Sequence, residues 1–203
     1  MHSRSDSQRG VESLLPSRGV PALPPLTDRP TLYSGCCLAL SRPLVAHVHS
    51  LLPPASALTL SIGSGFGLLE AYLAAAPYNA NVVGVEVEPS PNTHLPATRH
   101  CVVHGTRFLE PLAAEASAWL FVYPRRVGLV DEYLAAHGRE SESVHVIVWI
   151  GPQADWHDYQ RCFTPDWKVH TQSADAVGGK PWELIATAKR ASTCARGASS
   201  DAS

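Results

Sequence analysis

Three glycines alternate with other residues in a short stretch that separates an apolar run from a helix-like one. In "LTLSIGSGFGLLEAYLA", residues 58–74, they are Gly63, Gly65 and Gly67. Such a turn exposes backbone N–H groups and lets a ligand approach the main chain closely. Glu86 ends the next apolar run, about 20 residues beyond the glycines, an offset at which a carboxylate accepts hydrogen bonds from ribose hydroxyls. These residue types and their spacing predict a nucleoside-binding site.

Two other kinds of phosphate-binding loop fit this stretch poorly. The dinucleotide fingerprint G-x-G-x-x-G/A has Leu68 at its final position here, and no Gly-Lys-Ser/Thr follows the glycines as a P-loop requires. The remaining alternative is that the glycines only serve a crowded turn from a strand into a helix.

The elements that must position these residues follow from a regular alternation along the chain. Short apolar runs ("ALTLSI", "NVVGVEV", "RHCVV", "AWLFVY" and "VHVIVWI") are separated by stretches compatible with helices. The helix-compatible stretches are residues 36–52, with a kink or restart at Pro43, and residues 67–76, 107–116 and 127–138. Continuously apolar strands interleaved with helices indicate an α/β fold with a mostly parallel sheet covered on both faces. "WKVHTQ" and "PWELIATAKR" follow one another without a helix and predict a closing antiparallel strand pair.

Composition limits the remaining possibilities. The 203 residues suit one domain, expected over residues 31–190, between a disordered leader (1–30) and a disordered tail (191–203). The formal net charge is −2 and no basic block is present, so nucleic-acid binding is not indicated. No apolar run approaches the roughly 20 residues that span a bilayer, so no membrane association is expected.

The five cysteines form an odd set without C-x-x-C spacing. We interpret them as reduced thiols, which predicts a cytoplasmic protein with neither a disulfide framework nor a thiolate zinc site. His100 and His104 bracket a predicted strand but have no carboxylate partner in the sequence, so no metal site is predicted.

"LSIGSGFGLLEAYLA" followed by "VVGVEVEP" resembles motif I and the following acidic motif of the class I S-adenosylmethionine-dependent methyltransferases. The resemblance covers about residues 36–190 and implies a Rossmann-like three-layer sandwich that binds S-adenosyl-L-methionine. It also implies which part of the cofactor each residue contacts. The turn with Gly63, Gly65 and Gly67 would hold the methionyl part, Glu86 the ribose, and Gly105 and Thr106 the adenine. Ser61 and Ser64 are also expected to bind the cofactor.

Three departures from the family pattern motivate an alternative. Ser61 stands where the family commonly has an acid, Thr106 stands where an Asp is frequent, and "VYPRR" replaces the motif after the fourth strand. The alternative is a catalytically inactive methyltransferase-like binding or scaffold protein. A nicotinamide-dependent oxidoreductase is disfavoured by Leu68.

Methyl transfer needs two aligned reactants, with a base only where the acceptor must lose a proton. Tyr123, after the fourth strand, is a candidate to face the transferred methyl group; capping the strand is its alternative role. His157 is the candidate base, oriented by Asp155 or Asp158, and a plain surface position is its alternative.

The sequence thus predicts a methyltransferase acting on a small molecule. Only residues 31–57 precede the first strand of the predicted domain, which leaves little chain for a substrate lid. That suits either an open site for a large partner or a homodimer whose second subunit closes the pocket.

Overall fold

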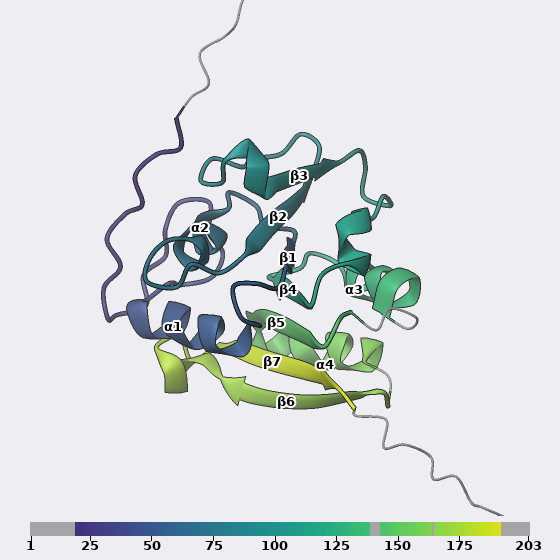
Figure 1. Ribbon diagram of the computed structural model, residues 1–203. Helices are drawn as coiled ribbons and strands as arrows, with labels where there is room; N and C mark the ends of the chain where they lie inside the picture. The colour runs from purple at the N-terminus through teal and green to yellow at the C-terminus, as the bar shows by residue number, and fades with distance from the viewer. Residues whose placement is uncertain (1–18, 139–142, 164, 192–203) are drawn as a thin grey trace, which may run out of the picture.

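One mixed sheet of seven strands organises the molecule (Figure 1). The computed structural model describes residues 19–138, 143–163 and 165–191. The strand order is β3-β2-β1-β4-β5-β7-β6, with β1 to β5 parallel and β7 antiparallel to both of its neighbours. The strands are β1 (Thr59–Ile62), β2 (Val82–Val87), β3 (His100–Val103), β4 (Ala118–Val122), β5 (Val146–Pro152), β6 (Trp167–Ser173) and β7 (Glu183–Arg190). The predicted parallel sheet and its closing antiparallel pair are confirmed.

Helices cover both faces of this sheet. They are α1 (Arg42–Leu51), α2 (Leu68–Ala74), α3 (Val127–Tyr133) and the short α4 (Trp156–Tyr159). Side chains alternate along each strand: Trp119 and Phe121 pack in the core on the α3 side, whereas Leu120 between them packs in the core with α1 and α2. All three of these side chains are fully buried. The result is the predicted three-layer α/β sandwich.

Short helical turns make up most of the remaining elements. They are η1 (Ala97–Arg99), η2 (Pro111–Ala114), the π-helical η3 (Leu134–Gly138) that continues α3, η4 (Gln153–Asp155), η5 (Gln160–Cys162) and η6 (Ala174–Val177).

Two helix predictions were wrong in extent. The helix expected over residues 36–52 begins at Arg42, because the Ser41 hydroxyl caps it by accepting from the Leu44 N–H. Pro43 lies in the first turn, where its missing N–H costs nothing, so it starts this helix and does not kink it. The stretch 107–116 forms only the single turn η2, again opened by a proline.

Part of the predicted leader contacts the domain. The Tyr72 hydroxyl donates to the Pro24 carbonyl, the Tyr33 hydroxyl donates to Pro25 O over 2.9 Å, and Leu23 and Leu26 pack against the core beside α1 and α2. The disorder predicted for residues 1–18 and 192–203 lies outside the described residues. Over the described part of the chain, no helix is both long and apolar enough to cross a membrane.

Candidate functional site

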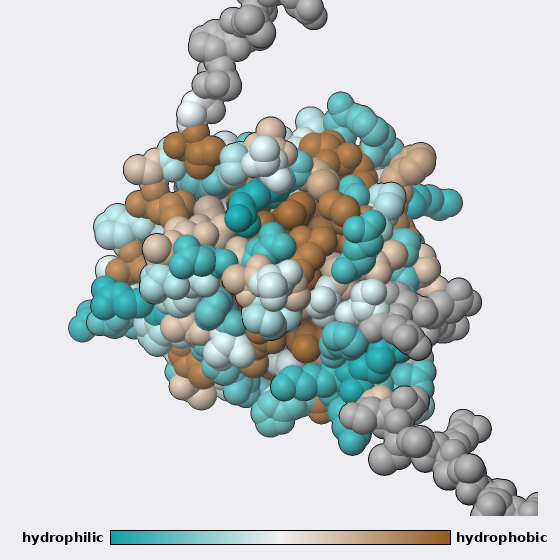
Figure 2. All heavy atoms as spheres, in the orientation of Figure 1, coloured by the Kyte–Doolittle hydropathy of each residue, from teal (hydrophilic) through white to brown (hydrophobic). Residues whose placement is uncertain are grey.

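The carboxyl ends of β1 to β4 lie at one edge of the sheet, and the segments that follow them surround a cavity of about 690 Å³. Strand β1 lies between β2 and β4 here, so the chain order reverses at this point, where open α/β sheets bind ligands. We call this space the cofactor cavity, after the ligand that we propose for it. The residues that line it lie within the segments 35–37, 62–70, 85–91, 103–108 and 122–133. Figure 2 shows hydrophobic atoms exposed on the upper part of the visible face, over β2 and β3 and toward α3.

Two of the three glycines open directly into the cofactor cavity. Gly63 and Gly65 line it and have φ angles of +79° and +57°, which side chains rarely adopt. A Cβ atom at Gly63 would meet nothing within 4 Å, and one at Gly65 would meet only the Gly35 carbonyl oxygen at 3.9 Å. A Cβ at Gly67 would instead lie 2.7 Å from Leu95 Cγ, so this glycine serves packing. Steric crowding therefore accounts for Gly67, whereas at Gly63 and Gly65 the positive φ favours glycine and leaves the backbone open to the cavity.

Glu86 points toward the glycine turn. Its Oε2 accepts from the Gly65 N–H over 2.8 Å and its Oε1 accepts from its neighbour Val87 N–H over 2.9 Å. The residue lines the cofactor cavity and is half-buried. Each carboxylate oxygen can accept further hydrogen bonds, so a ligand hydroxyl in the cavity has an acceptor available.

Ser61 and Ser64 lie on opposite sides of the turn. Ser64 lines the cavity, and its hydroxyl lies 3.5 Å from the Val85 carbonyl oxygen. Ser61 is buried in β1, and its hydroxyl donates to Glu70 Oε1 over 2.6 Å.

Sequence reasoning missed Glu70. It lies in the first turn of α2, is only 2 % exposed and lines the cofactor cavity. Burial raises its pKa to about 7, and the nearby Glu86 acts in the same direction. The available signal was an acidic residue inside the otherwise apolar helical run "LLEAYLA".

The loop after β3 forms the other end of the cavity. Gly105 and Thr106 line it, as does Phe108, whose side chain is largely exposed. Arg126 holds this loop: its guanidinium donates to the Thr106 carbonyl and also to both oxygens of Glu132, at 2.8 and 2.7 Å. Phe108 and the role of Arg126 were not predicted.

Tyr123 stands at the junction of two cavities. It follows β4 with a φ of +50° and its hydroxyl donates to Oε1 of the buried Glu183 over 2.9 Å. Burial, together with the hydrogen bond to Glu183, raises the pKa of this phenol, so it stays protonated at neutral pH. The hydrogen bond to Glu183 anchors Tyr123 at the sheet edge, as its alternative role of capping the strand requires, and its place in the cavity wall is compatible with a ligand contact.

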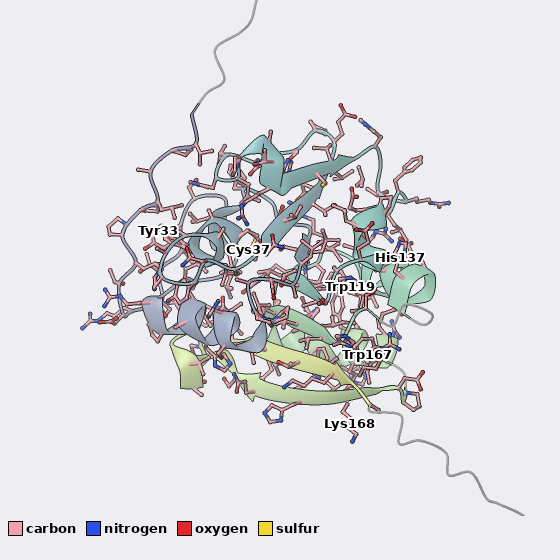
Figure 3. All side chains as sticks on the ribbon, viewed as in Figure 1. Tyr33, Cys37, Trp119, His137, Trp167 and Lys168 are labelled. Carbon is pink, nitrogen blue, oxygen red and sulfur yellow. The ribbon has the colours of Figure 1, made fainter. Side chains whose placement is uncertain are left out.

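The second cavity, of about 530 Å³, shares Tyr123 and Arg126 with the cofactor cavity. Trp149, Asp155 and Asp158 line its other side. We call it the acceptor cavity, after the ligand that we propose for it. Figure 3 labels Cys37, which lines both cavities, near the centre of the view.

The structure places His157 away from both cavities. Its side chain is exposed, it lines neither space, and its Nδ1 lies 3.0 Å from Gln160 Nε2. The sequence suggested Asp155 or Asp158 as its partner, but these acids line the acceptor cavity.

The histidines that bracket β3 have separate partners. His100 pairs with the Ser90 hydroxyl and His104 with Glu88. Among the described residues, no group of three His, Cys, Asp or Glu side chains is arranged to hold a metal ion.

Comparison with known proteins supports the fold alone. No protein-family model matches the sequence, and no curated protein matches it. Among solved structures, it is similar to a precorrin-6y C5,15-methyltransferase from Geobacter metallireducens, at 13 % identity over 82 % of this chain and 100 % of the other, with a TM-score of 0.59. It is also similar to the small RNA methyltransferase HEN1, at 11 % identity over 75 % of this chain and 25 % of the other, with a TM-score of 0.53. The strand order, the glycine turn at the end of β1 and these similarities agree: the chain has the Rossmann-like fold of the class I methyltransferases.

Proposed function

We propose that the protein is an S-adenosyl-L-methionine-dependent methyltransferase that binds its cofactor in the cofactor cavity. One observation carries the proposal. The Glu86 carboxylate and the open turn at Gly63 and Gly65 face the same space at the topological switch point. A ligand whose ribose lies at the carboxylate and whose charged amino-acid part lies along the exposed backbone of the turn fits this pair of features.

The residues of the cavity fit that cofactor. Bound there, it would supply a methyl group carried on a sulfonium. In our assignment Glu86 accepts hydrogen bonds from the ribose, and Gly63, Ser64 and Gly65 lie along the methionyl part. Gly105 and Thr106 lie beside the adenine, where Arg126 fixes the loop. Ser61 contributes through Glu70, toward which its hydroxyl points.

We place a small-molecule methyl acceptor in the acceptor cavity. Its volume of about 530 Å³ suits a small ligand, and it meets the cofactor cavity at Tyr123. In this assignment the neutral phenol of Tyr123 orients the acceptor through a hydrogen bond. Asp155 and Asp158 are the carboxylates placed to take a proton or bind a cationic group. His157 has no part in this assignment, because its side chain lies outside both cavities.

Isothermal titration calorimetry with S-adenosylhomocysteine tests the cofactor assignment. We expect the wild type to bind, and Glu86→Ala to bind about 10- to 100-fold more weakly, because charge-assisted hydrogen bonds to the ribose are lost. Glu115→Ala is the control, since Glu115 is exposed and outside the cavities. NAD in place of the cofactor should give no heat. A wild type that binds no S-adenosyl compound would refute the function. A Glu86→Ala variant that binds as tightly as the wild type would show that the cofactor binds elsewhere on the protein.

A further inference from the structure

We propose that Glu70 is the anion that binds the ammonium group of the cofactor's methionyl part, and that the Ser61 hydroxyl holds it in place. The acidic group at this end of the site would then come from helix α2 and not from strand β1. This inference rests on the proposed function and assigns one further contact within the same site.

Glu70 is positioned for that role by two elements. Helix α2 starts directly after the glycine turn, so its first turn brings Glu70 to the cavity wall beside Gly63 and Gly65. The hydroxyl of Ser61, two residues before Gly63, donates to Oε1 over 2.6 Å and fixes the carboxyl group. The methionyl part is assigned to this same end of the cavity.

The Ser61 hydroxyl stabilises the charge of Glu70 in part, but no cationic side chain among the described residues pairs with it. Over residues 19–138, 143–163 and 165–191, none of the ion pairs involves Glu70. The titratable groups that act on it are Glu86 from β2 and Cys36 from the segment before α1. Burial raises the pKa of the Cys36 thiol to about 12, so it stays neutral, and Glu86 raises the pKa of Glu70 further. A buried carboxylate in such surroundings is costly unless it is protonated or meets a cation.

A cation supplied by the ligand would offset the free-energy cost of the buried Glu70 carboxylate. The pKa of Glu70 is raised to about 7, so a large fraction of the carboxyl groups is protonated at neutral pH. An ammonium group beside Glu70 would favour the carboxylate and lower that pKa. Binding below pH 7 should therefore release a proton, and affinity should fall as the pH is lowered from 7 to 5. Near pH 8 Glu70 is mostly ionised, so its contribution to the pH dependence should level off.

Two ligands and one isosteric variant test this role by calorimetry. S-adenosylhomocysteine carries the ammonium group, whereas 5′-methylthioadenosine has the same nucleoside without it. Glu70→Gln should bind S-adenosylhomocysteine about 10- to 100-fold more weakly, because a charge-assisted contact is lost. It should bind methylthioadenosine as the wild type does. Titration at pH 6 in two buffers of different ionisation enthalpy should show proton release for the wild type and not for the variant.

Each result distinguishes this inference from the proposed function. A wild type that binds neither ligand refutes both. A Glu70→Gln variant that binds S-adenosylhomocysteine as tightly as the wild type overturns the role of Glu70 and leaves the function standing. Equal weakening of both ligands would also overturn it, because it would mark a general structural effect. If the variant does not fold, the wild type alone decides: binding at pH 6 without proton release refutes the inference.

Discussion

The Tyr123 hydroxyl donates a 2.9 Å hydrogen bond to Oε1 of Glu183, a buried carboxylate at the start of β7. The same carboxylate accepts from the backbone N–H groups of Ala39 and Lys180, at 3.2 and 2.9 Å. One side chain thus joins the end of β4, the segment before α1 and the turn that precedes β7. The wall between the two cavities is fixed by this set of bonds.

Tyr123→Phe should destabilise the protein by about 1–3 kcal/mol, because it removes a donor from a buried carboxylate. Urea denaturation measures this difference in the free energy of unfolding. Tyr33→Phe is the matched control: it removes an exposed hydroxyl that donates to Pro25 O, and should change stability by about 0.5 kcal/mol or less. Equal effects of the two substitutions would contradict the structural role given to Tyr123.

Alanine substitutions at Gly63 and Gly67 should have different effects on ligand binding and on stability. Gly63→Ala places a methyl group in open space, so it should weaken S-adenosylhomocysteine binding strongly and cost about 1–2 kcal/mol from its positive φ. Gly67→Ala also drives a methyl group against Leu95 and should lower the melting temperature more. Calorimetry and thermal unfolding of both variants check this order. A Gly63→Ala variant with full affinity would show that the turn does not contact the ligand.

Arg126→Ala should affect binding more than stability. The ion pair with Glu132 is partly exposed, and such pairs contribute about 1 kcal/mol or less. The loss of the contact to the Thr106 carbonyl should free the loop after β3 and weaken binding of methylthioadenosine. Lys168→Ala is the control, because Lys168 is exposed on β6 and lines neither cavity. Unchanged nucleoside binding in Arg126→Ala would argue against this loop as the adenine site.

Glu70 should make the stability of the ligand-free protein depend on pH. Folding raises its pKa from 4.5 to about 7, so its stabilising contribution is fully present below pH 4.5 and is lost as the pH rises through 7. The wild type should therefore lose roughly 3 kcal/mol relative to Glu70→Gln between pH 4 and pH 8. Urea denaturation of both proteins across this range measures the difference. A constant difference would show that Glu70 titrates normally.

The sheet was predictable because strands that are buried on both faces are continuously apolar in the sequence. In β4, Trp119 and Leu120 face opposite sides and are both fully buried, so the strand is continuously apolar in the sequence. The helix expected over residues 107–116 failed for a local reason. Pro111 cannot donate a backbone hydrogen bond, and only one turn forms beside it.

The site was predictable only where its parts have a fixed spacing along the chain. The glycine turn and Glu86 belong to one strand-helix-strand unit, so their distance in sequence reports their distance in space. The contact between Tyr123 and Glu183 joins residues 60 positions apart, and no local pattern encodes it. His157 was assigned to its acidic neighbours, but Gln160, three residues on and therefore on the same helical face, is its partner.

The proline-rich segment before α1 limits how far the recombinant protein can be shortened at its N-terminal side. The Pro24, Pro25 and Leu26 carbonyls accept hydrogen bonds from Tyr72, Tyr33 and Arg42. Recombinant truncation at residue 31 would remove all three acceptors and uncover the apolar surface beneath Leu23 and Leu26. Trimming for crystallisation or spectroscopy should therefore retain the chain from residue 19 onward, and a protease that cleaves between residues 23 and 30 should loosen α2 and, with it, the turn it follows.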